Sequence, residues 1–127
     1  LYTSICANLI IPDIRKALQR STAKKIYLCN AMTQKGETDH YAMEDHVSTI
    51  ETHAEIKVDE VIVYNDEIPE KLLEKYAKQD SHPVLMRNKQ HPYKVLHRKL
   101  LHYDDDLIRH DSNRIETVIA MILKELT

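Results

Sequence analysis

Short runs of branched apolar residues alternate with longer stretches that carry apolar residues at helical spacing, and this alternation restricts the fold more than any other feature. The pattern predicts strands at residues 25–30, 60–64, 83–86 and 98–103, and helices at residues 11–20, 43–55, 69–78 and 111–126. Strands separated by helices of about ten or more residues favour a parallel sheet with right-handed crossovers. The sequence therefore predicts an α/β protein with a three-layer, mostly parallel, Rossmann-like sheet.

Each predicted helix has an apolar face that a sheet could cover. Pro12 and Pro69 suit the first turns of two of these helices. The last helix has the clearest pattern, and Asp111 or Ser112 is its expected N-cap. The residues expected to be buried are Ile14, Ala17 and Leu18, then Met43, Val47 and Ile50, then Leu72, Leu73 and Tyr76, and finally Ile115, Val118, Ile119, Ile122, Leu123 and Leu126.

A long polar loop follows the first predicted strand and leads into the second predicted helix. It contains many hydrogen-bonding side chains and Gly36, the only glycine in the chain. Open parallel sheets bind ligands beyond the carboxyl ends of their strands, so this loop is the first candidate site. Polar residues that follow the other predicted strands would share this edge, namely Asn65, Asp66, Arg87, Asn88, Asp104, Asp105, Asp106 and Arg109.

The neutral side chains of the loop suit recognition more than bond cleavage. Asn30, at the tip of the strand, can donate and accept hydrogen bonds, as a base edge or a sugar hydroxyl requires, or it can cap the turn that follows. Thr33, Gln34 and Thr38 offer similar hydrogen-bonding chemistry. We expect these residues to recognise a ligand that is rich in hydroxyl groups or contains a heterocycle.

Acidic residues lie both in the loop and just after it. Glu37 and Asp39 could hold a Mg²⁺ ion attached to a diphosphate, although carboxylates at this spacing also cap helices. Glu44 and Asp45 fall in the first turn of the next helix, where they complement the helix dipole and would repel a phosphate. We therefore expect the loop to contact the base, sugar or acceptor of a ligand and not its phosphates.

Two residues outside the loop are candidate ligand contacts. Arg109 has a planar guanidinium that suits a diphosphate or a uracil-like carbonyl, and an ion pair with the acidic run Asp104–Asp106 is the alternative. Tyr76 could stack on a base or a sugar, and the alternative is a place in the apolar core.

Composition argues against several classes of function. The formal net charge is −2 and the pI is near 6.5, with acidic and basic residues interspersed, so no nucleic-acid partner is expected. Cys6 and Cys29 lie in apolar surroundings without metal-type spacing, which is typical of reduced core cysteines in a cytoplasmic protein. No signal peptide, membrane-spanning run, zinc motif or nucleophilic triad is recognisable, so neither membrane insertion nor a catalytic residue is expected.

Several short motifs occur in the same order as in a known family. Residues 29–41, CNAMTQKGETDHY, are similar to C-N-x-M-T-Q-P-G-E-T-D-G-Y, and residues 1–9, LYTSICANL, are similar to S-L-Y-T-S-I-x-x-N-L. Asp45-His46-Val47, Val63-Tyr64-Asn65 and Arg109-His110-Asp111 match D-H-V, V-x-N and R-H-D. On these motifs the chain resembles the CofD/YvcK-like family (UPF0052), in the YvcK branch often called gluconeogenesis factors. Lys35 stands where that family usually has proline, and His40 stands where it usually has glycine.

The resemblance implies that residues 1–127 are the C-terminal portion of a larger CofD/YvcK-like α/β domain. Family members carry a glycine-rich nucleotide loop and a G-P-G turn before these motifs, whereas this chain opens on Leu1 and has one glycine. A complete, glycine-poor domain is the alternative. The apolar strands at 26–29 and 61–64 would leave an isolated segment of this kind in need of a cover, so we expect it to aggregate or to form a homodimer.

The resemblance also implies a function. It points to a non-enzymatic bacterial regulator that binds a nucleotide sugar such as UDP-N-acetylglucosamine and acts in cell-shape control and carbon metabolism. The alternative, from the CofD branch, is a 2-phospho-L-lactate transferase that moves a phospholactyl group from a nucleotide-activated donor onto a deazaflavin precursor. The expected ligand-binding residues are Asn30, Thr33, Gln34, Glu37, Thr38, Asp39, Tyr76 and Arg109.

Overall fold

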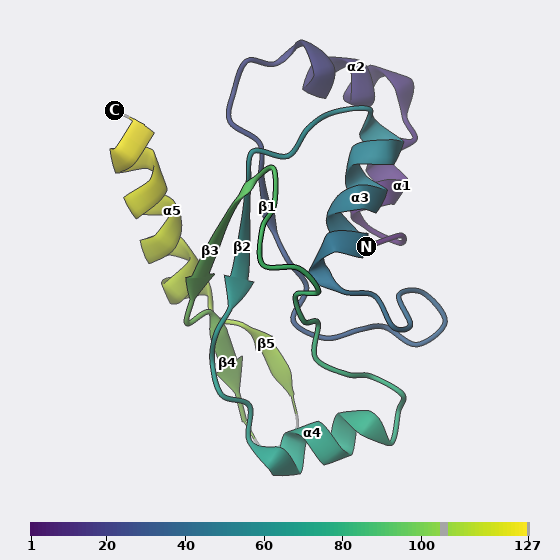
Figure 1. The fold of residues 1–127 in the computed structure, drawn as a ribbon, viewed down its shortest axis with the longest axis vertical. Coiled ribbons are helices and arrows are strands. Elements are labelled where there is room, and N and C mark those ends of the chain that lie inside the picture. The colour runs from purple at the N-terminus through teal and green to yellow at the C-terminus, as the bar shows by residue number, and fades with distance from the viewer. Residues whose placement is uncertain (105–106, 127) are drawn as a thin grey trace.

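The sheet at the centre of the molecule has three parallel strands in the order β1-β2-β3. In this computed structural model, which describes residues 1–104 and 107–126, the strands are β1 (Ile26–Leu28), β2 (Glu60–Tyr64) and β3 (Lys94–Arg98) (Figure 1). β2 is central and almost wholly buried, as expected for a strand with a neighbour on each side and helices on both faces. β1 lies at one edge of the sheet.

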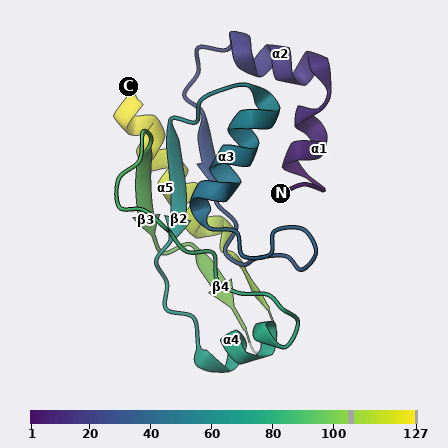
Figure 2. The same cartoon turned by 45° about the vertical axis from the view of Figure 1, so that its right-hand side comes forward.

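Helices cover both faces of the sheet (Figure 2). α1 (Ile5–Leu9) and α3 (Met43–Ala54) lie on one face, and α2 (Pro12–Arg20) crosses their ends near the start of β1. α5 (Ser112–Leu126) lies on the other face. The predicted three-layer, mostly parallel α/β fold is confirmed. Across residues 1–104 and 107–126, none of the helices has both the length and the apolar character needed to cross a membrane.

A smaller group of elements lies beyond the carboxyl ends of the parallel strands (Figure 1). It consists of α4 (Glu70–Ala77) and an antiparallel hairpin of β4 (Leu101–Tyr103) and β5 (Ile108–His110). These elements surround the edge at which parallel sheets usually bind ligands.

Two apolar clusters, one on each face of the sheet, form the core. The first joins the sheet to α1 and α3 and contains the fully buried Met43 and Val47. The second joins β2 and β3 to α5 and contains the fully buried Leu100 and Ile122. Each such side chain contributes roughly 1.5–3 kcal/mol through the apolar surface it removes from water.

The segment predicted as a strand at 83–86 is not a strand, and that prediction is wrong. It makes one isolated antiparallel bridge, between Pro83 and Met32. Two hydrogen bonds form this bridge, from the N–H of Val84 to the carbonyl of Ala31 at 2.8 Å and from the N–H of Thr33 to the carbonyl of His82 at 2.7 Å. The carbonyl of Leu85 accepts a hydrogen bond from the N–H of Met43 at 2.9 Å, so the segment joins the loop that follows β1 to the start of α3.

The strand predicted at 98–103 is divided in two. β3 ends at Arg98 and β4 begins at Leu101, because the carboxylate of Asp66 accepts hydrogen bonds from the N–H groups of Leu100 and Leu101 at the turn between them. The sequence pattern does not predict most of β3, where only Val95 and Leu96 are apolar, nor does it predict the short elements α1 and β5.

The apolar faces of the helices are buried to different extents. Met43, Val47 and Ile50 of α3 are buried as predicted, and so is Leu72 of α4. α2 has no buried residue, and α5 buries only part of its predicted stripe, because no other part of the described chain covers its remaining side. The predicted core residues that are exposed instead are Ile14, Ala17, Ile119, Leu123 and Leu126.

The loop between β1 and α3 adopts special backbone geometry at two positions. The N–H of Glu37 donates to the carbonyl of Gln34 at 3.0 Å across a turn in which Gly36 has φ of 77°, the arrangement of a type II turn. Lys35 occupies the position where such a turn favours proline. His40 has φ of 63°, in the left-handed region that favours glycine. The two departures from the family motif thus fall where backbone geometry favours the family's residues.

Candidate functional site

Five of the eight predicted binding residues line one pocket, whose volume is about 420 Å³. The pocket lies where the carboxyl end of β1 and the start of the loop face α4 and β5. The five residues that meet there are Asn30, Thr33, Gln34, Tyr76 and Arg109. The side chains of Leu28, Ala31, Met32 and Ile108 add apolar surface to its walls.

Asn30 is held by a residue of β1. The hydroxyl of Tyr27 donates to Oδ1 of Asn30 at 3.0 Å. Burial raises the pKa of Tyr27, so the phenol stays protonated and can keep donating. The Nδ2 group of Asn30 makes no hydrogen bond with any other described residue, so the amide protons are what this side chain offers to a ligand.

Thr33 fixes one wall of the pocket. It is buried, and its Oγ1 accepts a hydrogen bond from the N–H of His82 at 2.9 Å. Its N–H donates to the carbonyl of His82 at 2.7 Å, and its carbonyl accepts from the hydroxyl of Ser81 at 2.6 Å. Thr33 therefore joins two distant segments. The exposed Gln34 beside it accepts a hydrogen bond at Oε1 from the backbone nitrogen of Leu1 at 3.4 Å, so its Nε2 group is what it can offer to a ligand.

Tyr76 and Arg109 form the opposite wall. The hydroxyl of Tyr76 accepts a hydrogen bond from the N–H of Ile108 at 2.8 Å, which attaches α4 to β5. The guanidinium of Arg109 lies 3.5 Å from the carboxylate of Asp104, and the two side chains are 59% and 49% exposed. An exposed pair of this kind is worth only about 0–1 kcal/mol, so an anionic ligand could replace Asp104. Asp105 and Asp106, the other predicted partners of Arg109, lie outside the described residues.

Two lining residues, Ser81 and His110, were not predicted as ligand contacts. The Nε2 atom of His110 is buried and has no hydrogen-bond partner among the described residues. Burial lowers the pKa of His110, so its imidazole is neutral at pH 7. The Arg109-His110-Asp111 motif is the sequence signal that could have identified His110. Asp111 itself caps α5, because its carboxylate accepts a hydrogen bond from the N–H of Asn113 at 2.9 Å.

The carboxylate of Glu37 lies outside the pocket and binds the start of the chain. It accepts hydrogen bonds from the N–H groups of Tyr2 and Thr3. Partial burial alone would raise the pKa of Glu37, but these N–H groups outweigh burial and lower it. Among residues 1–104 and 107–126, no three histidine, cysteine or acidic side chains gather in a group that could hold a metal ion.

Thr38 and Asp39 also bind the backbone of their own loop. The Oγ1 of the buried Thr38 accepts a hydrogen bond from the N–H of Gln34 at 2.9 Å, and the carboxylate of Asp39 accepts one from the N–H of Gly36 at 2.7 Å. Glu37, Thr38 and Asp39 therefore shape the loop in this structure, and contact between them and a ligand stays a prediction.

The other predicted edge residues do not join this pocket. Asn65 and Asp66 line a separate polar pocket of about 500 Å³ at the end of β2. The N–H groups of Arg87 and Asn88 both donate to the carboxylate of Glu44 at the start of α3. The edge is thus divided into two pockets, with β4 and β5 between them.

Comparison with known proteins identifies the family of the chain. A model of the family described as 2-phospho-L-lactate transferase CofD matches residues 1–101. The gluconeogenesis factors of Bacillus subtilis and Halalkalibacterium halodurans are 36% and 37% identical to this chain over 98% and 94% of its length, and the chain spans 41% and 38% of theirs. The crystal structure of a UPF0052 protein from Bacillus halodurans superimposes with a TM-score of 0.85 at 34% identity, over 94% of this chain and 39% of that one. The chain belongs to the CofD family.

Proposed function

We propose that the chain forms the ligand-recognition part of a cytoplasmic, nucleotide-sugar-binding regulator of the gluconeogenesis-factor type, with a ligand like UDP-N-acetylglucosamine. The observation that carries this proposal is the pocket at the end of β1 that gathers Asn30, Gln34, Tyr76 and Arg109. The names of the relatives support a role in carbon metabolism, and a role in cell shape rests on the family resemblance. The free, buried cysteines Cys6 and Cys29 support the cytoplasmic location.

The chemistry of the pocket favours a neutral, hydroxyl-rich group next to a single anionic or carbonyl group. The Nδ2 group of Asn30 and the amide of Gln34 can bond to a base edge or to sugar hydroxyls. Tyr76 presents a ring whose hydroxyl is already bonded, which leaves its face for packing. Arg109 supplies the positive charge, and its weak pair with Asp104 costs little to break.

The nearest helix start does not suit phosphate binding. The carboxylate of Glu44 accepts hydrogen bonds from a neighbouring loop, and that of Asp45 accepts one from the N–H of Ala42 at 2.8 Å. These two negative charges occupy the N-terminus of α3. We therefore propose that the phosphates bind a part of the full-length protein that lies outside this chain. This chain would then be the C-terminal portion of one α/β domain, and its alignment with the C-terminal half of longer relatives supports that proposal.

A phospholactyl transferase is the second candidate function, and the description of the matching family favours it. Transfer to an acceptor hydroxyl needs a group that takes up the proton as the hydroxyl attacks phosphorus. His110 is the pocket residue with suitable chemistry, because its imidazole is neutral and its Nε2 atom has no partner in the described chain. Turnover of a nucleotide-activated phospholactate that is lost in His110→Gln would support this candidate over the regulator.

A binding screen of the full-length protein tests the leading proposal. Calorimetry with UDP-N-acetylglucosamine, UDP, ATP and NAD should give the tightest binding for the UDP-sugar, because neutral hydrogen-bonding groups predominate in the pocket. Equal or tighter binding of ATP would contradict the proposal.

A further inference from the structure

The outer edge of β1 is unpaired in the part of the chain that the structure describes. The N–H of Cys29 donates to the carbonyl of Ile62 at 3.0 Å, so the odd-numbered residues of this strand pair with β2. Successive residues of a parallel strand direct their backbone groups to opposite edges. The N–H and C=O groups of Ile26 and Leu28 therefore point away from β2, toward the open edge.

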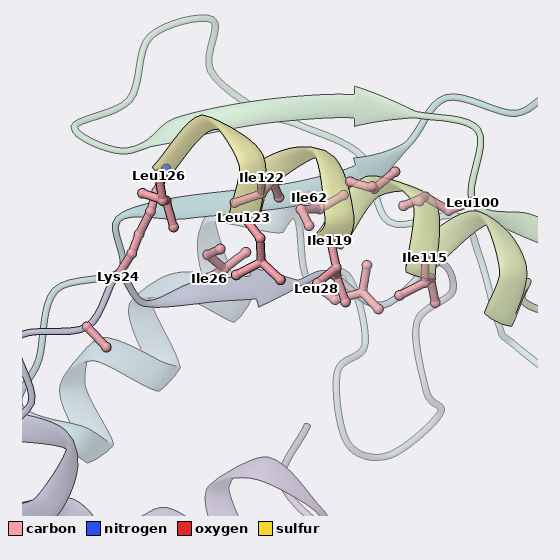
Figure 3. A pocket seen from close by; sticks show the side chains of 12 residues that line it. Lys24, Ile26, Leu28, Ile62, Leu100, Ile115, Ile119, Ile122, Leu123 and Leu126 are labelled. Carbon is pink, nitrogen blue, oxygen red and sulfur yellow. The ribbon is translucent and has the colours of Figure 1, made fainter.

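An apolar groove follows this edge on one face of the sheet (Figure 3). Its volume is about 370 Å³, and side chains of β1 and α5 are turned toward each other across it. Leu123 and Leu126 of α5 are 58% and 55% exposed, and Ile26 of β1 is 39% exposed. Contiguous apolar surface of this kind is usually covered in a folded protein.

A second apolar hollow follows the same edge on the opposite face. Its volume is about 570 Å³, and Ile5, Leu9 and Leu18 line it together with Ile26 and Leu28. An unpaired strand edge thus has uncovered apolar surface both above and below it. This combination fits a further strand with apolar side chains on both faces, the pattern of a strand inside a parallel sheet.

The path of the first 25 residues shows where such a strand would connect. The backbone nitrogen of Leu1 lies 3.4 Å from Oε1 of Gln34, beyond the carboxyl end of β1. α1 and α2 then lead back to the opposite end of the sheet, where the strands have their amino ends and where β1 begins (Figure 1). Two parallel strands are connected by a helical segment of this kind, which returns from the carboxyl end of one strand to the amino end of the next.

The positions of the helices show on which side of β1 the preceding strand would lie. α3 connects β1 to β2, and α1 packs against α3 on the same face of the sheet. Right-handed crossovers that step across a sheet in one direction place their helices on one face. A strand that precedes α1 and obeys this rule lies beside β1, on the side away from β2.

We infer that a strand preceding Leu1 in the full-length protein pairs in parallel with Ile26 and Leu28, with α1 and α2 as its crossover, and fills the two apolar hollows beside β1. The lengths of the relatives support this occupant, since the chain spans 41% and 38% of theirs. The inference does not depend on the identity of the ligand.

Residue-resolved hydrogen exchange of the full-length protein tests the inference within one molecule. Tyr27 and Cys29 serve as internal controls because their N–H groups pair with β2. The N–H groups of Ile26 and Leu28 should exchange as slowly as those of the controls, because both edges of β1 are then paired. Exchange of Ile26 and Leu28 about 100-fold or more faster than the controls would mean that the edge is open and would overturn the inference.

Two further measurements exclude other occupants of the groove. Leu123→Lys should lower the Tm of the full-length protein by about 4 °C or more, whereas Ala120→Lys, on an exposed part of α5 outside the groove, should change it by less than about 1 °C. Equal effects of the two substitutions would overturn the inference. If the protection of Ile26 and Leu28 disappears when dilution separates dimers into monomers, the edge is paired with a second copy of the chain. That result would also overturn the inference.

Discussion

The two helices that cover opposite faces of the sheet differ in how well this chain buries them. α3 has twelve residues, and five of them are buried. α5 has fifteen residues and a longer apolar stripe, but Val118 and Ile122 are its two buried residues. The shorter helix is the better covered because α1, β1 and the loop before it all pack around it, whereas the side of α5 next to β1 has no such neighbour among the described residues.

This difference shows that an amphipathic pattern reports how much surface a helix can bury and not which segment buries it. The apolar stripe of α5 is wide enough to pack against a neighbour on each side. In the described residues it packs against β2 and β3 on one side only. The face of α3, by contrast, is completed within this chain. Substitutions in the two helices can therefore separate what the chain stabilises by itself from what it shares with the rest of the protein.

The largest effect is expected in the core of α3. Met43→Ala should lower the free energy of unfolding of the full-length protein by about 2–5 kcal/mol, because Met43 is 1% exposed and the change leaves a cavity. Leu123→Ala is the matched change in α5, and it should cost more than about 1 kcal/mol if the groove is covered. Urea unfolding measures both. A cost for Met43→Ala that is no larger than that of an exposed residue would show that the comparison is wrong.

The next effect concerns the first turn of α3 and depends on pH. Burial alone would raise the pKa of Glu44, but hydrogen bonds from His91 and from the N–H groups of Arg87 and Asn88 outweigh it and lower the pKa from 4.5 to about 2. The stability that Glu44 contributes is therefore fully present above pH 4.5 and is lost as the pH falls toward 2. It amounts to at most about 3 kcal/mol.

Urea unfolding at pH 7 and near pH 2 checks this dependence. Glu44→Gln should destabilise the protein at pH 7 and have little effect near pH 2. Glu116→Gln, at an exposed position of α5, should change stability by less than about 0.5 kcal/mol at both pH values. A cost of Glu44→Gln that stays the same at both pH values would contradict the role assigned to these hydrogen bonds.

The smallest effect is expected in the loop that leads into α3. Lys35 occupies the proline position of the type II turn before Gly36, so Lys35→Pro should stabilise the protein by about 0.4–1 kcal/mol. The ion pair of Lys35 with Asp80 would be lost, but both side chains are largely exposed and the loss is small. Thermal unfolding measures the gain, and a lower Tm would show that the turn differs from the one described.

The sequence predicts elements best where one local pattern determines them. The bounds of β2 are predicted correctly, because a strand buried on both faces is a continuous apolar run. Most of β3 is missed, because Lys94 and His97 are exposed and interrupt its apolar pattern. The burial of α5 is overestimated, because the apolar pattern of a helix does not show which other segments pack against it.

The same limit applies to the pocket. Asn30, Thr33 and Gln34 can be predicted as edge residues because they directly follow β1. The contribution of Ser81 depends on a hydrogen bond to Thr33, which lies 48 residues away in the chain, and no local pattern reports such a contact. His110 reaches the pocket only because β5 pairs with β4, so the Arg109-His110-Asp111 motif is the one local signal that points to it.

The most direct test of the account is the affinity of the full-length protein for UDP-N-acetylglucosamine, measured by calorimetry for Asn30→Ala and Arg109→Ala. Asn113→Ala and Arg20→Ala, which alter exposed residues outside the pocket, are the matched controls. Each pocket variant should raise Kd by about fivefold or more, because a ligand group in a partly desolvated site loses its partner, while the controls bind as the unaltered protein does. Unchanged affinity in both pocket variants, with Tm preserved, would contradict the assignment of this pocket as the ligand site.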